Sequence, residues 1–213
     1  GVGLTDFTQS LLDGKSGIRH QPNLEKLGFG CQVAGEPLVK DNLIDDYFTP
    51  LERRGLNATG IVYGVIAGVD AWKDAGLEKN TSNEPFWDRG IIFGTGILGV
   101  DKFREAIHLI DEGNVRRLGS TSVIQTMAYE RISQGKAEII LTGSCSDSGP
   151  YVWGGFDAMR ILPRGYNDNP TKASRPMSAT ASGFIPGSAT YNPTKFTFLM
   201  KKLIVVLSLM LMG

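Results

Sequence analysis

Histidine and cysteine are scarce in this chain, which limits the sites that it could form. The 213 residues include two histidines and two cysteines, Cys31 and Cys145, which lie far apart in the sequence. Neither cysteine has a second ligand residue at the spacing of a zinc site. We therefore expect no metal site, and we interpret both thiols as reduced packing residues of a cytoplasmic protein.

The chain also lacks an excess of charge of either sign. Its 22 basic and 22 acidic residues give a net charge of zero, so no electrostatic surface for nucleic acid or an anionic membrane is expected. The apolar run that starts at Leu203 has 11 residues, fewer than the roughly 20 that cross a bilayer. We expect neither a nucleic-acid partner nor a membrane span.

The distribution of apolar residues predicts an α/β protein. Hydrophobic residues make up 41% of the chain, enough for one sizeable core. Strands are expected at the short apolar runs 90–93 and 138–142, both of which end at glycine. Helices are expected at residues 5–12, 57–75, 100–112, 127–134 and 152–160. Alternating strands and helices indicate a layered α/β architecture.

Several motifs resemble those of the β-ketoacyl-acyl carrier protein synthases, the condensing enzymes of fatty acid and polyketide assembly. They are Gly14-Lys-Ser-Gly-Ile18, Asp74-Ala-Gly-Leu77, Gly94-Thr-Gly96, Gly155-Phe-Asp-Ala-Met159, Ser174-Arg-Pro-Met177 and Ser182-Gly-Phe-Ile-Pro-Gly187. The resemblance covers residues 1–189. The chain departs from the family pattern at Met177, which is more often Phe, and at Ser188, which is usually Glu.

This resemblance implies a partial thiolase-like fold. The family fold has five layers, αβαβα, built from two similar halves, and residues 1–189 resemble the N-terminal half. The first strand and turn of that half precede the position that matches Gly1. We therefore expect a truncated ketosynthase N-terminal domain over residues 1–189.

The junction between Met127 and Ala128 is the most informative departure from the family. Both sides of it, 120–127 and 128–143, resemble family segments that are separated in the condensing enzymes. The separating segment carries the cysteine nucleophile on a strand-to-helix turn. The catalytic histidines and lysine of the family belong to its second half. The resemblance thus implies that no residue of this chain is catalytic.

The implied family reaction is the decarboxylative Claisen condensation of acyl and malonyl thioesters. Its partner is acyl carrier protein bearing phosphopantetheine thioesters, the intact enzymes are homodimers, and the expected location is the cytoplasm. We expect this chain to belong to that acyltransferase family without condensing activity. A non-catalytic remnant or interaction partner is the alternative.

A glycine motif supports a weaker alternative, a nicotinamide-dependent reductase. Gly94-Thr-Gly-Ile-Leu-Gly99 has the dinucleotide-binding spacing between an expected strand and an expected helix. The acidic residue that normally follows about 20 residues later is missing, because that position is Gly119. The same turn occurs in the condensing enzymes, so we expect no bound cofactor.

A second reductase signal lies near the C-terminus. Tyr191 and Lys195 have the Tyr-x-x-x-Lys spacing of short-chain dehydrogenases, and Ser178 lies upstream. That chemistry needs both side chains on one helical face, and Pro193 between them disfavours a helix. We interpret the spacing as accidental.

Three further side chains are candidates for catalysis. Cys145 follows an expected strand, but a nucleophilic thiol needs a histidine, a cation or a helix N-terminus to lower its pKa. In the family, its position lies downstream of the catalytic turn, so we interpret it as a small buried residue. His20 and His108 match no catalytic histidine, and His108 is expected on a surface helix.

The family resemblance ends before residues 190–213. From Met200, two lysines and an apolar run resemble the start of a secretory signal peptide, here at the wrong end of the chain. We interpret this tail as a misplaced signal-peptide start acquired through a frameshift or deletion. A terminal helix or strand that packs on the core is the alternative. If the tail is unrelated, its removal should improve solubility.

Overall fold

The chain folds into two compact units, each assembled from segments that are distant in the sequence. The computed structural model describes residues 4–119, 122, 125, 139–187, 193–196 and 203–206. The first unit comprises Gly1–Leu38, Asp147–Ser188 and Met210–Gly213, and the second comprises Val39–Ser146 and Ala189–Leu209. These units do not follow the expected division into 1–189 and 190–213, which stays a prediction.

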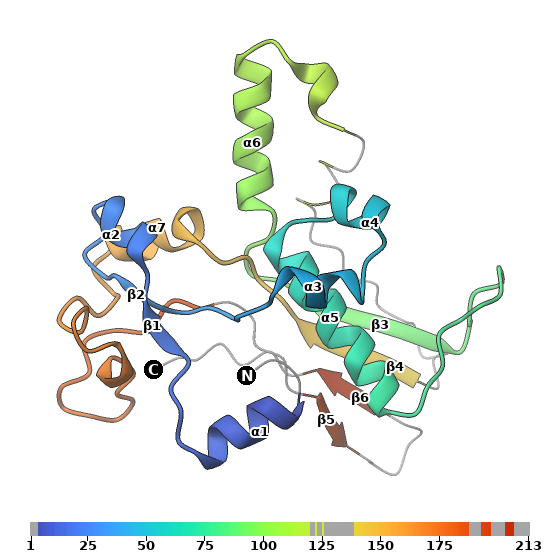
Figure 1. Ribbon diagram of the computed structural model, residues 1–213, viewed down its shortest axis with the longest axis horizontal. Coiled ribbons are helices and arrows are strands. Elements are labelled where there is room, and N and C mark those ends of the chain that lie inside the picture. Colours follow the sequence, from blue (N-terminus) through green and yellow to red (C-terminus); the bar gives the residue numbers. More distant parts are fainter. Residues whose placement is uncertain are drawn as a thin grey trace. The chain divides into compact units, whose positions relative to one another are not determined.

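The first unit combines short helices with a two-stranded sheet (Figure 1). Its elements are α1 (Leu4–Leu12), β1 (Ile18–His20), α2 (Pro22–Lys26), β2 (Val33–Gly35), α7 (Pro150–Ala158) and the 3-10 helix η3 (Pro170–Lys172). β1 and β2 are antiparallel, with Ile18 opposite Gly35. A parallel bridge between Gly35 and Gly187 joins the second segment of the unit to this sheet.

Apolar side chains from both segments form the core of the first unit. Leu24 and Ala34 pack with Trp153 of α7. A second cluster contains Ile18, Cys31, Val33, Leu162, Ala173 and Ile185. Beside it, the rings of Phe156 and Phe184 meet edge to face at 5.3 Å between centroids. Each cluster therefore requires residues from both ends of the sequence.

Two polar side chains fix the backbone between α2 and β2. The Asp157 carboxylate accepts hydrogen bonds from the backbone N–H groups of Gly30 (3.0 Å) and Cys31 (2.9 Å). Asn167 accepts from the N–H of Gln32 at 2.9 Å and donates to the carbonyl of Gly30 at 3.1 Å. These bonds give the 30–32 backbone the partners that a sheet would otherwise provide.

Two glycines of the first unit lie where a side chain would meet close neighbours. A Cβ at Gly30 would lie 2.5 Å from Nε of Arg164, whose guanidinium also donates to the Asp157 carboxylate at 3.2 Å. Gly183 has a φ of +138°, and a Cβ there would lie 2.2 Å from the carbonyl oxygen of Ile161. Alanine at either position would force the backbone or Arg164 to move.

The second unit contains the parallel sheet. Its elements are α3 (Asp41–Asp45), α4 (Pro50–Gly55), α5 (Thr59–Asp74), β3 (Arg89–Gly94), α6 (Val100–Asp111), the 3-10 helix η1 (Val115–Arg117), β4 (Ile139–Ser144), β5 (Pro193–Phe196) and β6 (Leu203–Val206). The strand order is β3-β4-β6-β5, with β5 antiparallel to β6 and the other neighbours parallel. In the first pair, Arg89 lies opposite Ile139.

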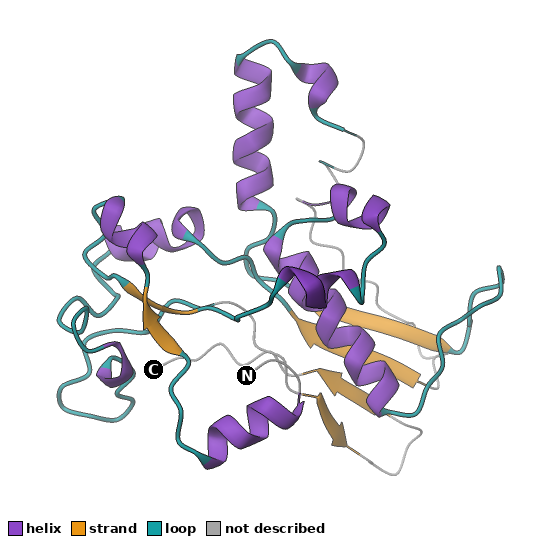
Figure 2. Cartoon of the chain, in the orientation of Figure 1, coloured by secondary structure: helices purple, strands orange, loops and turns teal. Residues whose placement is uncertain are grey.

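Helix α5 packs on this sheet through small and branched residues (Figure 2). Ala67 and Ala71 contact Leu141 of β4, and Val62 and Ile66 pack with Phe48. The small residues let the helix axis approach the strands closely, because they project little beyond the backbone. The sequence 57–75 predicted this helix, and the structure confirms it with bounds of Thr59–Asp74.

Side-chain acceptors define two helix starts in the second unit, one local in sequence and one distant. Thr49 and Glu52 form a reciprocal capping box, and Pro50 occupies the first turn of α4. Before α5, Oε1 of the buried Gln125 accepts from the N–H groups of Asn57 and Ala58, both at 2.9 Å. Gln125 thus gives the start of α5 a shared acceptor from a segment 67 residues later.

Most sequence-based elements are confirmed, with small shifts. The expected helices 5–12, 100–112 and 152–160 correspond to α1, α6 and α7, and the expected strands correspond to β3 and β4. α7 begins two residues earlier than expected, at Pro150, which suits a first helical turn. The expected helix 127–134 lies outside the described residues. No helix of the described chain is long and apolar enough to span a bilayer.

The C-terminal segment contributes strands to the second unit. β6 pairs with β4, with Leu141 opposite Ile204, and β5 pairs with β6. This pairing is the alternative that the sequence left open, a terminal strand on the core. The origin of residues 190–213 is untested, but the backbone of 203–206 now has a structural role. Removing residues 190–213 would also remove β5 and β6, so we no longer expect the removal to improve solubility.

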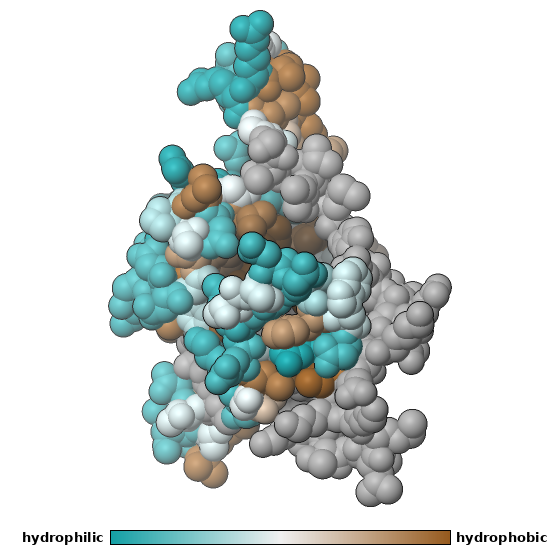
Figure 3. Space-filling view, turned by 90° about the vertical axis from the view of Figure 1, so that its right-hand side faces the viewer, coloured by the Kyte–Doolittle hydropathy of each residue, from teal (hydrophilic) through white to brown (hydrophobic). Residues whose placement is uncertain are grey.

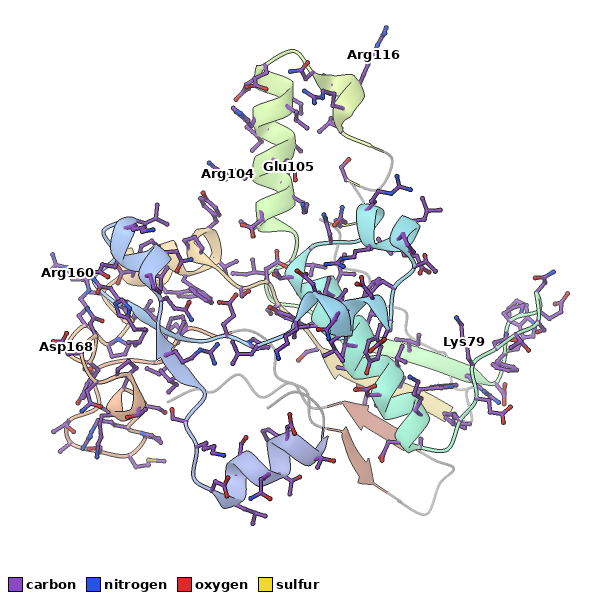
Figure 4. All side chains as sticks on the ribbon, in the orientation of Figure 1. Lys79, Arg104, Glu105, Arg116, Arg160 and Asp168 are labelled. Carbon is purple, nitrogen blue, oxygen red and sulfur yellow. The ribbon has the colours of Figure 1, made fainter. Side chains whose placement is uncertain are left out.

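We predict that Asp157→Ala lowers the free energy of unfolding by about 3 kcal/mol, because it leaves the buried N–H of Cys31 and the partly buried N–H of Gly30 without their charged acceptor. Asp157→Asn keeps one acceptor oxygen and should cost less. Urea denaturation monitored by circular dichroism measures both. Asp168→Ala is the control, because Asp168 is exposed and projects outward (Figure 4), and its effect should stay within about 0.5 kcal/mol.

We predict that deleting residues 190–213 destabilises the second unit, because it removes β5 and β6 and leaves one side of β4 unpaired. Val205→Pro should act similarly, since it removes a backbone donor from the strand between two neighbours. Each should lower the thermal midpoint by more than about 5 °C, whereas Val205→Thr should not. A deletion variant that is more soluble and equally stable would contradict the role of these strands.

Candidate functional site

The carboxyl ends of β3 and β4 bring two loops together. The strands are parallel, and Gly94 lies opposite Ser144, so both end at the same edge of the sheet. The N–H of Cys145 donates to the carbonyl of Gly94 at 3.0 Å. A Cβ at Gly96 would lie 3.8 Å from Oγ of Ser146. In α/β proteins this edge is where ligands bind, which makes it the first candidate site.

The glycine motif forms the turn from β3 to α6 that the sequence predicted. Gly99 adopts a left-handed φ of 72° at the N-cap of α6, and no side chain caps the helix. Within the described part of the chain, the buried Oγ1 of Thr95 has no hydrogen-bond partner. The turn therefore has the strand-to-helix context of a phosphate-binding loop.

The charge at this helix start opposes an anionic ligand. Asp101 lies in the first turn of α6, where the dinucleotide-binding fold places a pyrophosphate. A carboxylate there occupies the positive end of the helix dipole and repels a phosphate. The motif thus has the backbone shape of a cofactor-binding turn, but the negative charge of Asp101 disfavours a phosphate there.

Cys145 is close to the candidate edge but buried. Its exposed fraction is 8%, and its N–H is part of the β3–β4 hydrogen bonding. The histidine of this unit, His108, is exposed and pairs with Glu112 at 3.2 Å. It lies eight residues beyond the start of α6, or about 12 Å along the helix axis. The predicted burial of Cys145 is confirmed, and the geometry does not provide an activated nucleophile.

Cys31 is fully buried in the first unit. Its thiol donates to the carbonyl of Val33 at 3.6 Å. Burial raises the pKa of the Cys31 thiol, and the charge of Asp157 raises it further. A raised pKa disfavours the thiolate that nucleophilic chemistry needs. Cys31 is therefore a packing residue, as the sequence predicted.

His20 belongs to a small polar cluster of the first unit. Its Nε2 lies 3.3 Å from Oε1 of Gln32 and 3.6 Å from the Glu25 carboxylate. These neighbours orient the ring on the surface of the β1–β2 sheet. No group of three or more His, Cys, Asp or Glu side chains in the described ranges is arranged to hold a metal ion.

The sequence did not predict a second polar cluster in the first unit. Oγ of the buried Ser148 donates to the Glu36 carboxylate at 3.1 Å, and Arg19 donates to the Glu36 backbone carbonyl at 2.6 Å. Ser148 and Glu36 are 112 residues apart, so no local pattern could reveal the pair. A serine held by a carboxylate lacks the imidazole that activates it in hydrolases, so we interpret the pair as structural.

The described residues do not support the short-chain dehydrogenase arrangement, which needs a helix at Lys195. Lys195 lies in strand β5, in which alternate residues point to opposite faces, and not in a helix. Tyr191 lies outside the described residues. Ser178 hydrogen-bonds with Thr180 at 3.0 Å in a loop of the other unit. The interpretation of this spacing as accidental agrees with the strand.

We predict that NADH and NADPH do not bind with sub-millimolar affinity, because Asp101 lies where the pyrophosphate would be. Calorimetric titration of the purified chain measures this. Gly96→Val should leave the titration unchanged. Sub-millimolar binding that Gly96→Val abolishes would contradict the electrostatic argument and support the reductase alternative.

Comparison with known proteins gives a consistent family. No family model matches the chain. It is 28% identical to 3-oxoacyl-[acyl-carrier-protein] synthase 2 of Vibrio harveyi. The alignment, 214 positions long with its gaps, covers 84% of this chain and 50% of the relative. It is 25% identical to putative polyketide beta-ketoacyl synthase 1 of Streptomyces halstedii, over 88% of this chain and 53% of the relative.

Solved structures show the same fold. A β-ketoacyl synthase from Burkholderia phymatum matches with a TM-score of 0.69 at 21% identity, over 85% of this chain and 52% of that structure. The type II polyketide ketosynthase AntDE, in complex with the acyl carrier protein AntF, matches with a TM-score of 0.62 at 20% identity, over 88% and 52%. The chain spans about half the length of the curated relatives it matches. The chain is therefore a homologue of the β-ketoacyl-acyl carrier protein synthases over about 85% of its length, as its sequence motifs predicted.

Proposed function

We propose that this chain is a ketosynthase scaffold of fatty acid or polyketide assembly that does not itself carry an acyl group. The supporting observation is the combination of family homology over 84% of the chain with the burial of both of its thiols. Its fold corresponds in this proposal to the N-terminal half of the five-layer thiolase-like architecture. The missing element is the nucleophile segment at the junction of Met127 and Ala128.

The family reaction explains why an accessible thiolate is needed. The cysteine attacks the acyl thioester on the carrier protein, which releases the phosphopantetheine thiol and leaves an acyl-enzyme. Malonyl-carrier protein then loses carbon dioxide, and the resulting carbanion attacks the acyl-enzyme and expels the cysteine thiolate. Each step needs an exposed nucleophile or hydrogen-bond donors where negative charge develops.

The described residues offer poor substitutes for that machinery. Cys145 is 8% exposed, and burial raises the pKa of Cys31. His108 pairs with Glu112 on the surface of α6, and His20 lies beside Gln32 in the other unit. Cys31 and His20 belong to the same unit, but the Cys31 thiol is buried and donates to the Val33 carbonyl at 3.6 Å, which does not make it available for acyl transfer. This arrangement supports a scaffold without condensing activity.

Carrier-protein binding remains the positive function in this proposal. The AntDE ketosynthase binds its carrier protein AntF, which supports an acyl carrier protein as the partner of this chain. An interaction partner of this kind could act without chemistry, whereas a remnant would bind nothing. We also propose a cytoplasmic location, although one similar protein is named chloroplastic and another mitochondrial.

We predict that the chain forms no acyl-enzyme. Radiolabelled hexanoyl-acyl carrier protein is mixed with the pure chain, and protein-bound label is measured before and after hydroxylamine, with an intact β-ketoacyl synthase as the positive control. Cys145→Ser and Cys31→Ser should behave like the unchanged chain. A stoichiometric, hydroxylamine-sensitive adduct that Cys145→Ser removes would contradict the proposal.

The chain and the carrier protein used in that assay also distinguish an interaction partner from a non-binding remnant. Calorimetric titration with phosphopantetheinylated carrier protein should give binding without acyl transfer if the chain is an interaction partner. Absence of both binding and transfer would overturn the proposed role and favour the remnant.

A further inference from the structure

Met177 has the most exposed side chain among the large apolar residues of the described chain. Its exposed fraction is 105%, against 66% for Met159 and 81% for Trp87. Figure 3 shows hydrophobic side chains among hydrophilic ones on one face of the chain, so exposure of an apolar group is not in itself unusual here. Met177 differs from most of these groups because its side chain carries a thioether sulfur, which peroxides can oxidise.

The backbone at Met177 has a conformation that methionine rarely adopts. In the loop after η3, the N–H of Ser178 donates to the carbonyl of Arg175 at 3.3 Å and closes a turn with Pro176 and Met177 at its centre. Met177 has a φ of 60°, in the left-handed region that favours glycine or asparagine at this position of a turn. The chain thus presents a long apolar side chain where a smaller residue would be less strained.

Hydrogen bonds of the neighbouring residues hold this turn in place. Nε of Arg175 donates to Oγ1 of Thr180 at 2.7 Å, and Oγ of Ser178 lies 3.0 Å from the same atom. The N–H of Thr180 donates to Oγ of Ser178 at 3.2 Å, and the hydroxyl of Tyr166 donates to the Thr180 carbonyl at 3.2 Å. These bonds join polar atoms around the turn and do not involve the Met177 side chain. The turn therefore holds the thioether in solvent.

The other sulfur atoms of the described residues are less accessible than that of Met177. Both cysteines are buried, and burial raises the pKa of the Cys31 thiol. A raised pKa disfavours the thiolate, which is the form of cysteine that peroxides oxidise. Met159 follows α7 as its C-cap and is partly covered. Within the described part of the chain, the sulfur that solvent reaches most easily is thus a thioether and not a thiol.

We propose that Met177 is a reversible oxidation site for hydroperoxides, and that it reacts before either cysteine. The thioether sulfur attacks the distal oxygen of the hydroperoxide, the O–O bond breaks, and a sulfur–oxygen bond forms. The sulfur loses two electrons, and the proton of the distal oxygen moves to the leaving oxygen, which departs as water or an alcohol. A methionine sulfoxide reductase reverses the change with two electrons from a dithiol, which becomes a disulfide, and releases water. This site is independent of the role proposed with carrier protein.

The first test maps oxidation in the full chain. The chain is incubated with hydrogen peroxide, samples are quenched over time, and the peptides that contain Met177, Met159 and each cysteine are quantified by mass spectrometry. Met177 should oxidise within about two-fold of the rate of a synthetic peptide of residues 170–182, and at least about two-fold faster than Met159, because access of peroxide to the sulfur limits the rate. Oxidation of Met177 more slowly than Met159, or after either cysteine, would overturn the proposal.

Substitutions assign the fast reaction to one sulfur. Met177→Leu keeps a side chain of similar size without sulfur, so it should remove the fastest addition of a single oxygen to the intact chain. Met159→Leu is the matched control, because it removes the other described methionine, and it should keep that fast addition. An unchanged fast addition in Met177→Leu would assign it to a different sulfur of the chain and would overturn the proposal.

A thermal scan tests whether the Met177 side chain is free of packing. Met177→Gly should not lower the thermal midpoint, because glycine accepts a left-handed φ, whereas the branched side chain of Met177→Val should lower it. A lower midpoint for Met177→Gly would show that the methionine packs on the fold, which contradicts its exposure.

Enzymatic repair tests the reversibility of the site. The oxidised chain is treated with methionine sulfoxide reductases of both stereochemical classes and dithiothreitol, with the oxidised peptide of residues 170–182 as the control. Both should regain the unoxidised mass at Met177, because the turn leaves the sulfoxide accessible to the reductases. Recovery of the peptide without recovery of the folded chain would overturn the reversible site.

Discussion

The contact of the Asp157 carboxylate with two backbone N–H groups is the constraint on which the first unit depends. It joins α7 to the Gly30–Cys31 backbone across 126 residues of sequence. Without it, the buried N–H of Cys31 and the partly buried N–H of Gly30 would lose their acceptor, which costs free energy of folding. A side chain at Gly30 would displace Arg164, which lies against it and binds the same carboxylate. Asp157 thus holds both the Gly30–Cys31 backbone and the Arg164 side chain in place.

In the second unit, the backbone provides the usual position of a reactive site, but the side chains there do not provide the reactive groups. The β3–β4 pair aligns two loops at its carboxyl edge, which is the position where α/β proteins place reactive groups. The groups actually present there are Cys145, which is buried, and a helix start that carries Asp101. A thiolate needs exposure and positive charge, and the edge provides neither from these two residues. Homology to the synthases therefore describes the framework more completely than the reaction.

The sequence predicted the long elements well and the short ones poorly, for physical reasons. α5 and α6 have enough residues for a clear apolar period, and β3 and β4 are apolar runs bounded by glycine. β1 and β2 have three residues each and exist because Gly187 and the Asp157 contacts hold them. Motifs located the turn at Gly94–Gly99 and the burial of Cys145. They could not reveal Glu36 with Ser148, because only folding brings that pair together.

Covering apolar surface is the main requirement that the described fold leaves open. In the first unit, α1 exposes Leu11 and Leu12, and in the second, Trp87 is exposed two residues before β3. These positions are scattered, and single exposed apolar residues are common on folded proteins. On α6, by contrast, the exposed residues Phe103, Ile107 and Ile110 lie within one helix at spacings that place them on a common face.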